Sequence, residues 1–152
     1  MPKLRVVLAK VGLDGHDVGI LLVAKQLIAA GFETIYLGKR NEPAGVAMAA
    51  LQEDAGVVGV SALSGGLAVF AIDTVNLLAD LGIAHVPVIA GGIDEPAEVR
   101  RMLDAGVRAY FGPGTAITDI VEAFRSVGLS DGTDRASREL RSRHSATREV
   151  EP

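Results

Sequence analysis

Residues 4–31 read LRVVLAKVGLDGHDVGILLVAKQLIAAG, and this stretch decides the fold. It opens with a short apolar run, Leu4–Ala9, whose length and β-branched composition are typical of a buried strand. A glycine-rich polar loop follows, and then a helical pattern that Gly31 ends well. The segment therefore predicts a strand, a loop and a helix. The helix residues expected to face inward are Ile20, Val23, Ala24, Leu27 and Ile28.

The same unit recurs along the chain. Because parallel strands joined by helices need right-handed crossovers, the repeat predicts an α/β fold with helices on both faces of the sheet. We expect a flavodoxin-like (Rossmann-like) doubly wound sheet of five parallel strands in the order 2-1-3-4-5. The further strands are predicted at Thr34–Leu37, Val57–Val60, Pro87–Ala90 and Arg108–Phe111. The further helices are predicted at Pro43–Asp54 (with Val46, Ala50 and Leu51 inward), Leu67–Leu81, Glu95–Ala105 and Ala116–Val127.

Composition limits the function classes. The length of 152 residues suggests one domain, and the net charge of −4 without a basic, aromatic-rich stripe argues against nucleic-acid binding. The absence of cysteine excludes a disulfide, a thiolate metal site and a cysteine nucleophile. We find no secretory pattern at the N-terminus and no apolar run of the roughly 18 residues that suggest a membrane span. The expectation is a soluble, cytoplasmic protein.

The character of the chain changes after Gly128. Residues 129–152 are rich in Arg, Asp and Glu and poor in apolar residues. We therefore predict a folded domain over residues 1–128 and a charged C-terminal tail over residues 129–152. Two readings of the tail stay open: a solvated or disordered segment, or a docking segment for another subunit.

Ligands of this fold bind beyond the carboxyl ends of the strands, near the switch point between strands 1 and 3. The first loop there places His16 between Asp14 and Asp17. Such a histidine can ligate a metal through one ring nitrogen while the other donates to a carboxylate, here Asp14, which Lys10 could orient. A surface polar histidine is the alternative. A conventional divalent-metal site would need further ligands, and the other loops at this end offer no His or Cys.

Small residues dominate the other loops at this end. They can expose backbone amides and admit a large ligand, and a glycine turn before a helix suits a phosphate. Each glycine pair could equally be an ordinary turn. The segments are Ser61-Ala-Leu63-Ser64-Gly65-Gly66, Gly91-Gly92 and Phe111-Gly112-Pro-Gly114-Thr115.

Three motifs in order form a specific combination. Asp14-x-His16-x-x-Gly19 is followed by Ser61-x-Leu63 and then by Gly91-Gly92. The set resembles the signature of the cobalamin-binding domains, the family that includes methylmalonyl-CoA mutase, glutamate mutase and methionine synthase. The resemblance covers about residues 4 to 125, and the wording around His16 and the Phe111–Thr115 turn looks most like the acyl-CoA mutase branch.

The resemblance implies roles for these residues. His16 would be the lower axial ligand of the cobalt, Asp14 would hydrogen-bond it, and Lys10 would support Asp14; these three form the expected catalytic relay. Gly19 would let the displaced nucleotide tail pass. The residues implied in binding the cofactor are Asp14, Gly15, His16, Asp17, Gly19, Ser61, Leu63, Ser64, Gly65, Gly91, Gly92, Gly112, Gly114 and Thr115.

The implied function is that of the small subunit of an adenosylcobalamin-dependent acyl-CoA mutase, an isomerase that rearranges a CoA ester through radicals. The substrate class is 2-hydroxyisobutyryl-, isobutyryl- or methylmalonyl-CoA. A large (β/α)8-barrel subunit would bind the acyl-CoA, because this chain has no room for the barrel. We expect the apolar residues Val18, Leu63 and Leu67 to be exposed for that contact. Val18 and Leu67 also depart from the residues common in this branch (Arg and His).

Two alternatives remain. A corrinoid carrier for methyl transfer would resemble this chain but usually has a helical cap before the first strand. A non-enzymatic signalling module, such as a receiver domain, needs an Asp at the end of strand 3, where Ser61 stands, and a Lys after strand 5.

Overall fold

The computed structural model describes residues 4–12, 18–63 and 65–128. Strands and helices alternate as predicted, and the ends of most elements shift by one to three residues. The elements are β1 (Arg5–Lys10), α1 (Val18–Ala29), β2 (Glu33–Tyr36), α2 (Pro43–Gln52), β3 (Val57–Ala62), α3 (Leu67–Asp80), β4 (Val88–Gly92), α4 (Pro96–Asp104) and β5 (Ala109–Phe111). A further helix covers residues 117–128.

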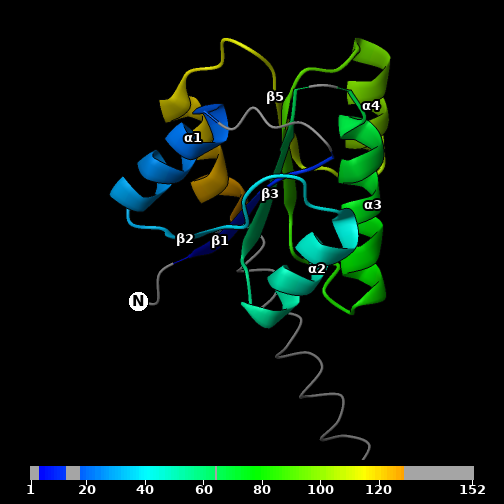
Figure 1. Cartoon of the computed structure of the whole chain (residues 1–152), viewed down its shortest axis with the longest axis horizontal. Coiled ribbons are helices and arrows are strands. Elements are labelled where there is room, and N and C mark those ends of the chain that lie inside the picture. Colours follow the sequence, from blue (N-terminus) through cyan, green and yellow to red (C-terminus); the bar gives the residue numbers. More distant parts are fainter. Residues whose placement is uncertain (1–3, 13–17, 64, 129–152) are drawn as a thin grey trace, which may run out of the picture.

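The five strands form one parallel sheet in the order β2-β1-β3-β4-β5, which confirms the predicted fold class. Helix α1 and the helix at residues 117–128 cover one face, and α2, α3 and α4 cover the other (Figure 1). The order reverses between β1 and β3, so the loops after these strands diverge to opposite faces and leave a crevice between them.

Each face of the sheet has its own apolar core, because alternate strand residues point to opposite sides. Val7, Ala9 and Val58 belong to the core under α2–α4, whereas Val6 and Leu8 belong to the core under α1 and the helix at residues 117–128. The small residues Ala47, Ala50, Ala68 and Ala71 are buried on α2 and α3 and allow these helices to lie close to the sheet.

The predicted inward orientation is wrong for two helix residues. Ile28 of α1 is 58% exposed and Leu51 of α2 is 40% exposed. At about 100° per residue both lie at the margin of the apolar stripe, beyond the part that the sheet covers. In α2 the buried residues are Val46, Ala47 and Ala50 instead.

Candidate functional site

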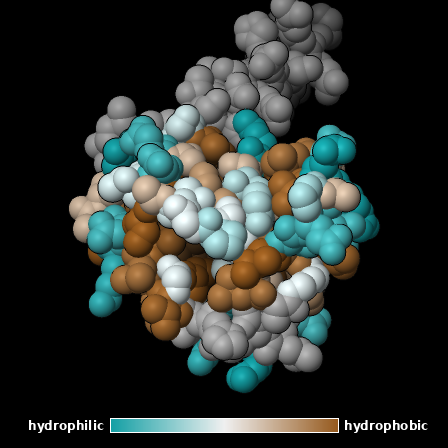
Figure 2. Space-filling view, turned by 90° about the horizontal axis from the view of Figure 1, so that it is seen from above, coloured by the Kyte–Doolittle hydropathy of each residue, from teal (hydrophilic) through white to brown (hydrophobic). Residues whose placement is uncertain are grey.

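A cavity of about 320 Å³ opens at the carboxyl end of the sheet, on the side of α1 and the helix at residues 117–128. This volume is within the range of small-molecule sites, roughly 300–1,000 Å³. Figure 2 views the molecule from that end and shows hydrophobic residues gathered on this face. The apolar side chains that line the cavity are Leu8, Ile20, Leu22, Val23, Val60, Leu63, Ile89, Ile93, Phe111, Ile117, Ile120 and Phe124.

Four site residues form one row across the sheet. Strand pairing aligns Lys10 with Ser61, Ser61 with Gly91, and Gly91 with Phe111. All four line the cavity, because residues in register on neighbouring strands point to the same face. The row brings together one residue from each of four predicted segments, which follow one another at about 20 to 50 positions in the sequence.

The next row on the same face forms the floor. Leu8, Gly59 and Ile89 are in register and line the cavity. A Cβ placed on Gly59 would lie 2.6 Å from Leu8 Cδ2 and 2.9 Å from Phe124 Cζ. Gly59 therefore admits the Phe124 ring from the helix at residues 117–128, and this packing closes the bottom of the cavity. The sequence analysis missed both residues, and the glycine inside an apolar strand was the available signal.

The glycines of the cavity are of two kinds. No atom lies within 4 Å of a Cβ placed on Gly19, and the nearest atom to one on Gly91 is the carbonyl oxygen of Phe111 at 3.8 Å. These two positions are open, and their lack of a side chain leaves space. Gly92 is different: its φ is +137° and a Cβ there would collide with the backbone of Ala62. Gly92 is thus required by the fold itself.

Lys10 is fully buried in the cavity row. Its backbone amide donates to the carbonyl oxygen of Gly38 over 3.1 Å, and its carbonyl oxygen accepts from the amide of Asn41 over 2.9 Å. The Asn41 side chain adds donations to the carbonyl oxygens of Lys10 (3.1 Å) and Gly38 (2.7 Å). Asn41 lies in the loop after β2, and it fixes the chain where it leaves β1. The sequence analysis did not predict this role.

Most of the predicted site residues that the structure describes line this cavity. Gly65 and Gly114 are exposed and do not line the cavity. Asp14, Gly15, His16, Asp17 and Ser64 lie outside the described residues, as does the tail at residues 129–152. The predicted residues that line the cavity are Lys10, Gly19, Ser61, Leu63, Gly91, Gly92, Gly112 and Thr115.

One expected contact residue is wrong. Leu67 is fully buried as the first residue of α3, where it packs into the core under α2–α4. It therefore offers no surface to another subunit. Val18 is 72% exposed and Leu63 is 43% exposed, as expected. Its place after a glycine loop did not reveal this, because the first side chain of a helix can face either the core or the solvent.

The described residues show neither a cluster of metal ligands nor a membrane-spanning helix. Residues 4–12, 18–63 and 65–128 contain no group of three or more His, Cys, Asp or Glu side chains that could hold a metal ion. Within the same residues, none of the helices has the length and apolar character needed to cross a membrane.

Comparison with known proteins identifies the class. The sequence pattern of the B12 binding domain matches residues 4–122. The chain therefore belongs to the family of B12-binding domains, as its three motifs indicated.

Two relatives match nearly the whole chain. The small subunit of 2-hydroxyisobutanoyl-CoA mutase from Aquincola tertiaricarbonis is 42% identical over 131 residues, with 85% of this chain and 95% of the relative covered. The small subunit of pivalyl-CoA mutase from Xanthobacter autotrophicus is 39% identical over 132 residues, with coverages of 87% and 88%. Methylmalonyl-CoA mutase from Escherichia coli is 33% identical over 117 residues, but only 16% of its length is matched. The resemblance to acyl-CoA mutase small subunits is thus confirmed.

Solved structures support the fold. A cobalamin-binding protein from Desulfitobacterium hafniense superposes with a TM-score of 0.71 at 23% identity, over 82% of this chain and 59% of that one. The receiver domain of NarL from Mycobacterium tuberculosis gives 0.65 at 20% identity, over 84% and 97%. At these identities the likeness shows the flavodoxin-like fold alone.

Proposed function

We propose that this chain is the small subunit of an adenosylcobalamin-dependent acyl-CoA mutase and that the cavity holds the nucleotide tail of the cofactor. The observation that carries the proposal is the row of Lys10, Ser61, Gly91 and Phe111. Four predicted segments meet in it around one cavity, and Lys10 stands six positions before His16 in the sequence.

The cavity suits the tail in shape and chemistry. The bicyclic base at the end of the tail is flat and apolar, and the cavity walls are mostly aliphatic. The open positions Gly19 and Gly91 leave room for the tail to pass close to the backbone. Ser61 and Thr115 supply the few hydroxyl groups that a nucleotide needs for orientation.

Buried Lys10 supports the proposed relay. A buried ammonium group is costly unless an acceptor pairs with it. Asp14, four residues further along the chain, is the acceptor that we propose. A carboxylate held by Lys10 would in turn hold His16 in the tautomer and orientation that a cobalt ligand requires.

The role that we propose for this chain is to hold the cofactor through the lining of this cavity. Bound adenosylcobalamin would supply the radical chemistry of the rearrangement. The residues of this chain would bind the tail, orient His16 and present the corrin to a large subunit. That subunit, by analogy with the named relatives, would carry the acyl-CoA and exclude water from the reaction. The acyl group itself stays open among the branched short-chain esters of these relatives.

Electron paramagnetic resonance of the full chain with cob(II)alamin tests the cofactor ligand. Protein labelled with ¹⁵N-histidine should show coupling of the cobalt electron to one protein nitrogen, and His16→Ala should abolish it. His85→Gln is the matched control, because His85 precedes β4 at the opposite end of the sheet. Coupling to the nucleotide base alone in the unsubstituted chain would contradict the proposed ligation.

A further inference from the structure

A tyrosine hydroxyl supports the cavity wall from behind. Tyr110 of β5 donates a 2.7 Å hydrogen bond to the carbonyl oxygen of Gly92, 18 positions earlier in the chain. Its ring packs against the core under α2–α4, the face of the sheet opposite to the cavity. The bond therefore directs the Gly92 carbonyl away from the cavity.

The same hydroxyl lies close to the second glycine segment. A Cβ placed on Gly112 would lie 3.3 Å from the Tyr110 hydroxyl oxygen. Both glycines line the cavity: Gly92 is the last residue of β4, and Gly112 directly follows the neighbouring strand β5. The Tyr110 hydroxyl thus lies close to both glycine segments. Its hydrogen bond to the Gly92 carbonyl oxygen fixes the Gly91-Gly92 segment directly.

Two further contacts hold the segment after Gly92. The amide of Ile93 donates to the carbonyl oxygen of Ala62 over 3.3 Å. The Asp94 carboxylate accepts from the amide of Ala68, at the start of α3, over 3.1 Å and from the amide of Glu95 over 2.9 Å. We call residues 91–94 the wall segment. Besides the strand pairing of Gly91 and Gly92, its contacts with Tyr110, Ala62 and Ala68 tie it to β5, β3 and α3.

We propose that Tyr110 is a positioning residue for the nucleotide-tail pocket, and that by fixing the wall segment it gives the chain its preference for corrinoids that carry a nucleotide tail. The inference rests on the proposed function. The proposed role of Tyr110 involves no contact between its side chain and the ligand. It acts through Gly92, which lines the cavity and whose carbonyl oxygen accepts the Tyr110 hydrogen bond.

The test compares two corrinoids, one with the nucleotide tail and one without it, and follows how each substitution changes the binding of each. Hydroxocobalamin carries the nucleotide tail and diaquocobinamide lacks it, and both offer cobalt to His16. Titration of the full chain, followed by absorbance, gives a dissociation constant for each. Tyr110→Phe should weaken hydroxocobalamin binding about 3- to 10-fold, the effect of one neutral hydrogen bond. Binding of diaquocobinamide should change less than about twofold, since no tail enters the cavity.

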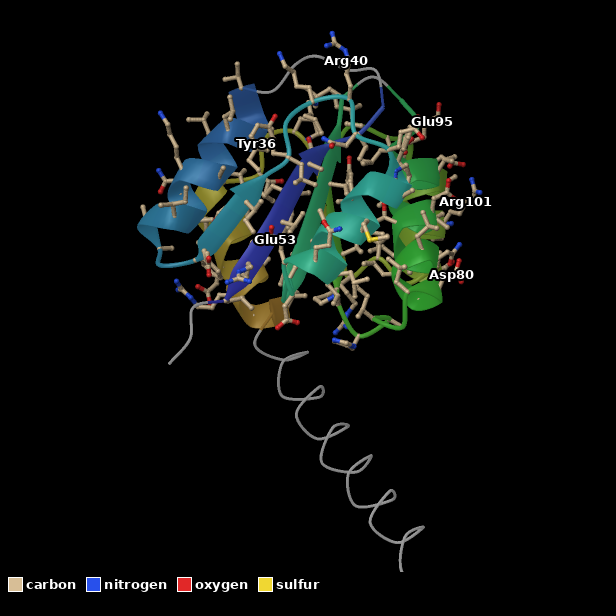
Figure 3. The ribbon with its side chains drawn as sticks, turned by 60° about the horizontal axis from the view of Figure 1, so that its bottom comes forward. Tyr36, Arg40, Glu53, Asp80, Glu95 and Arg101 are labelled. Carbon is tan, nitrogen blue, oxygen red and sulfur yellow. The ribbon has the colours of Figure 1, made fainter. Side chains whose placement is uncertain are left out.

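Tyr36→Phe is the matched control. Tyr36 is the other tyrosine of the chain and lies on β2, at the opposite edge of the sheet from β5 (Figure 3). It does not line the cavity, so its substitution should leave the ratio of the two dissociation constants unchanged. An equal loss of affinity for both ligands in Tyr110→Phe, or no loss for either, would overturn the positioning role.

A second variant approaches the same segment from the other side. Asp94→Asn replaces one acceptor oxygen by a donor and breaks one of the two bonds to the amides of Ala68 and Glu95. It should reproduce the selective loss for hydroxocobalamin, and Asp80→Asn at the far end of α3 should not (Figure 3). If the unsubstituted chain binds both ligands equally, the tail does not occupy the cavity and the proposed function fails as well.

Discussion

At the residue scale, the two glycines of the Gly91-Gly92 pair do different work. Gly91→Ala should leave the free energy of unfolding within about 1 kcal/mol, because the nearest atom to a Cβ there is the Phe111 carbonyl oxygen, at an ordinary contact distance of 3.8 Å. It should weaken hydroxocobalamin binding at least about tenfold, because the methyl group enters the cavity. Urea unfolding and ligand titration measure the two effects separately.

Gly92→Ala should have the opposite effect: it should reduce the stability of the fold more than Gly91→Ala does. Its methyl group collides with Ala62 and its φ lies in the left-handed half of conformational space, so unfolding should become easier by about 1–3 kcal/mol or more. Normal stability in this variant, or poor stability in Gly91→Ala, would show that the assignment of the two roles is reversed.

Asp14 is predicted to act through His16 rather than through the fold. Asp14→Asn should lower cobalamin affinity, or turnover in the assembled enzyme, about 10- to 100-fold, which is usual when the partner of a metal-bound histidine is removed. The melting temperature of the apoprotein should stay constant, and Lys10→Ala should affect affinity less. Affinity and turnover equal to those of the unsubstituted chain would mean that Asp14 is only solvated.

At the element scale, Phe124 of the helix at residues 117–128 closes the bottom of the cavity. Phe124 is 2% exposed and packs over Gly59 and Leu8. Phe124→Ala should therefore lower the free energy of unfolding by about 3–5 kcal/mol, the usual cost of emptying an aromatic site. Denaturant unfolding measures it. Ile28→Ala, on the exposed face of α1, should cost far less, and equal losses would count against this packing.

The sequence predicted elements better than it predicted side-chain environments. Alternation of short β-branched runs with helical patterns was sufficient for the strand order, because crossover handedness leaves few arrangements. Periodicity failed at Ile28 and Leu51, because how much of a helix the sheet covers depends on neighbouring elements.

The candidate site was predictable where motifs marked it. Lys10, Ser61 and Gly91 stand in one row, as their places at three strand ends suggested. The contacts made by Asn41 and Tyr110 were not predictable, because each joins segments 18 or more positions apart through a single polar group. Such pairs depend on strand register, which no local pattern reveals.

At the scale of the whole molecule, the exposed apolar side chains around the cavity mouth are the expected contact with a large subunit. They are Val18, Leu22, Leu63 and Ile93. The chain alone should show no mutase activity on branched acyl-CoA esters. Addition of a large subunit with adenosylcobalamin should restore it, as a coupled assay of product formation would record. Activity without a partner would refute this division of labour.

Substitution and truncation separate the parts of that contact. Val18→Asp should weaken association with the large subunit in gel filtration while cobinamide binding persists, because Val18 lies outside the cavity lining. Truncation after Gly128 tests the tail. Full activity without residues 129–152 would refute the hypothesis that the tail docks another subunit, but it would not affect the proposed contact through Val18.

The cross-sheet row also makes the ligand a reporter of folding. Lys10, Ser61, Gly91 and Phe111 come from four strands, and none of the pairs exists until β1, β3, β4 and β5 have assembled. A half-folded chain therefore lacks this row, and a ligand that needs the row would bind only the folded chain. By mass action each tenfold rise in free ligand above its dissociation constant adds about 1.4 kcal/mol to the native state. In a cell, vitamin supply would thus set the lifetime of this subunit against proteolysis.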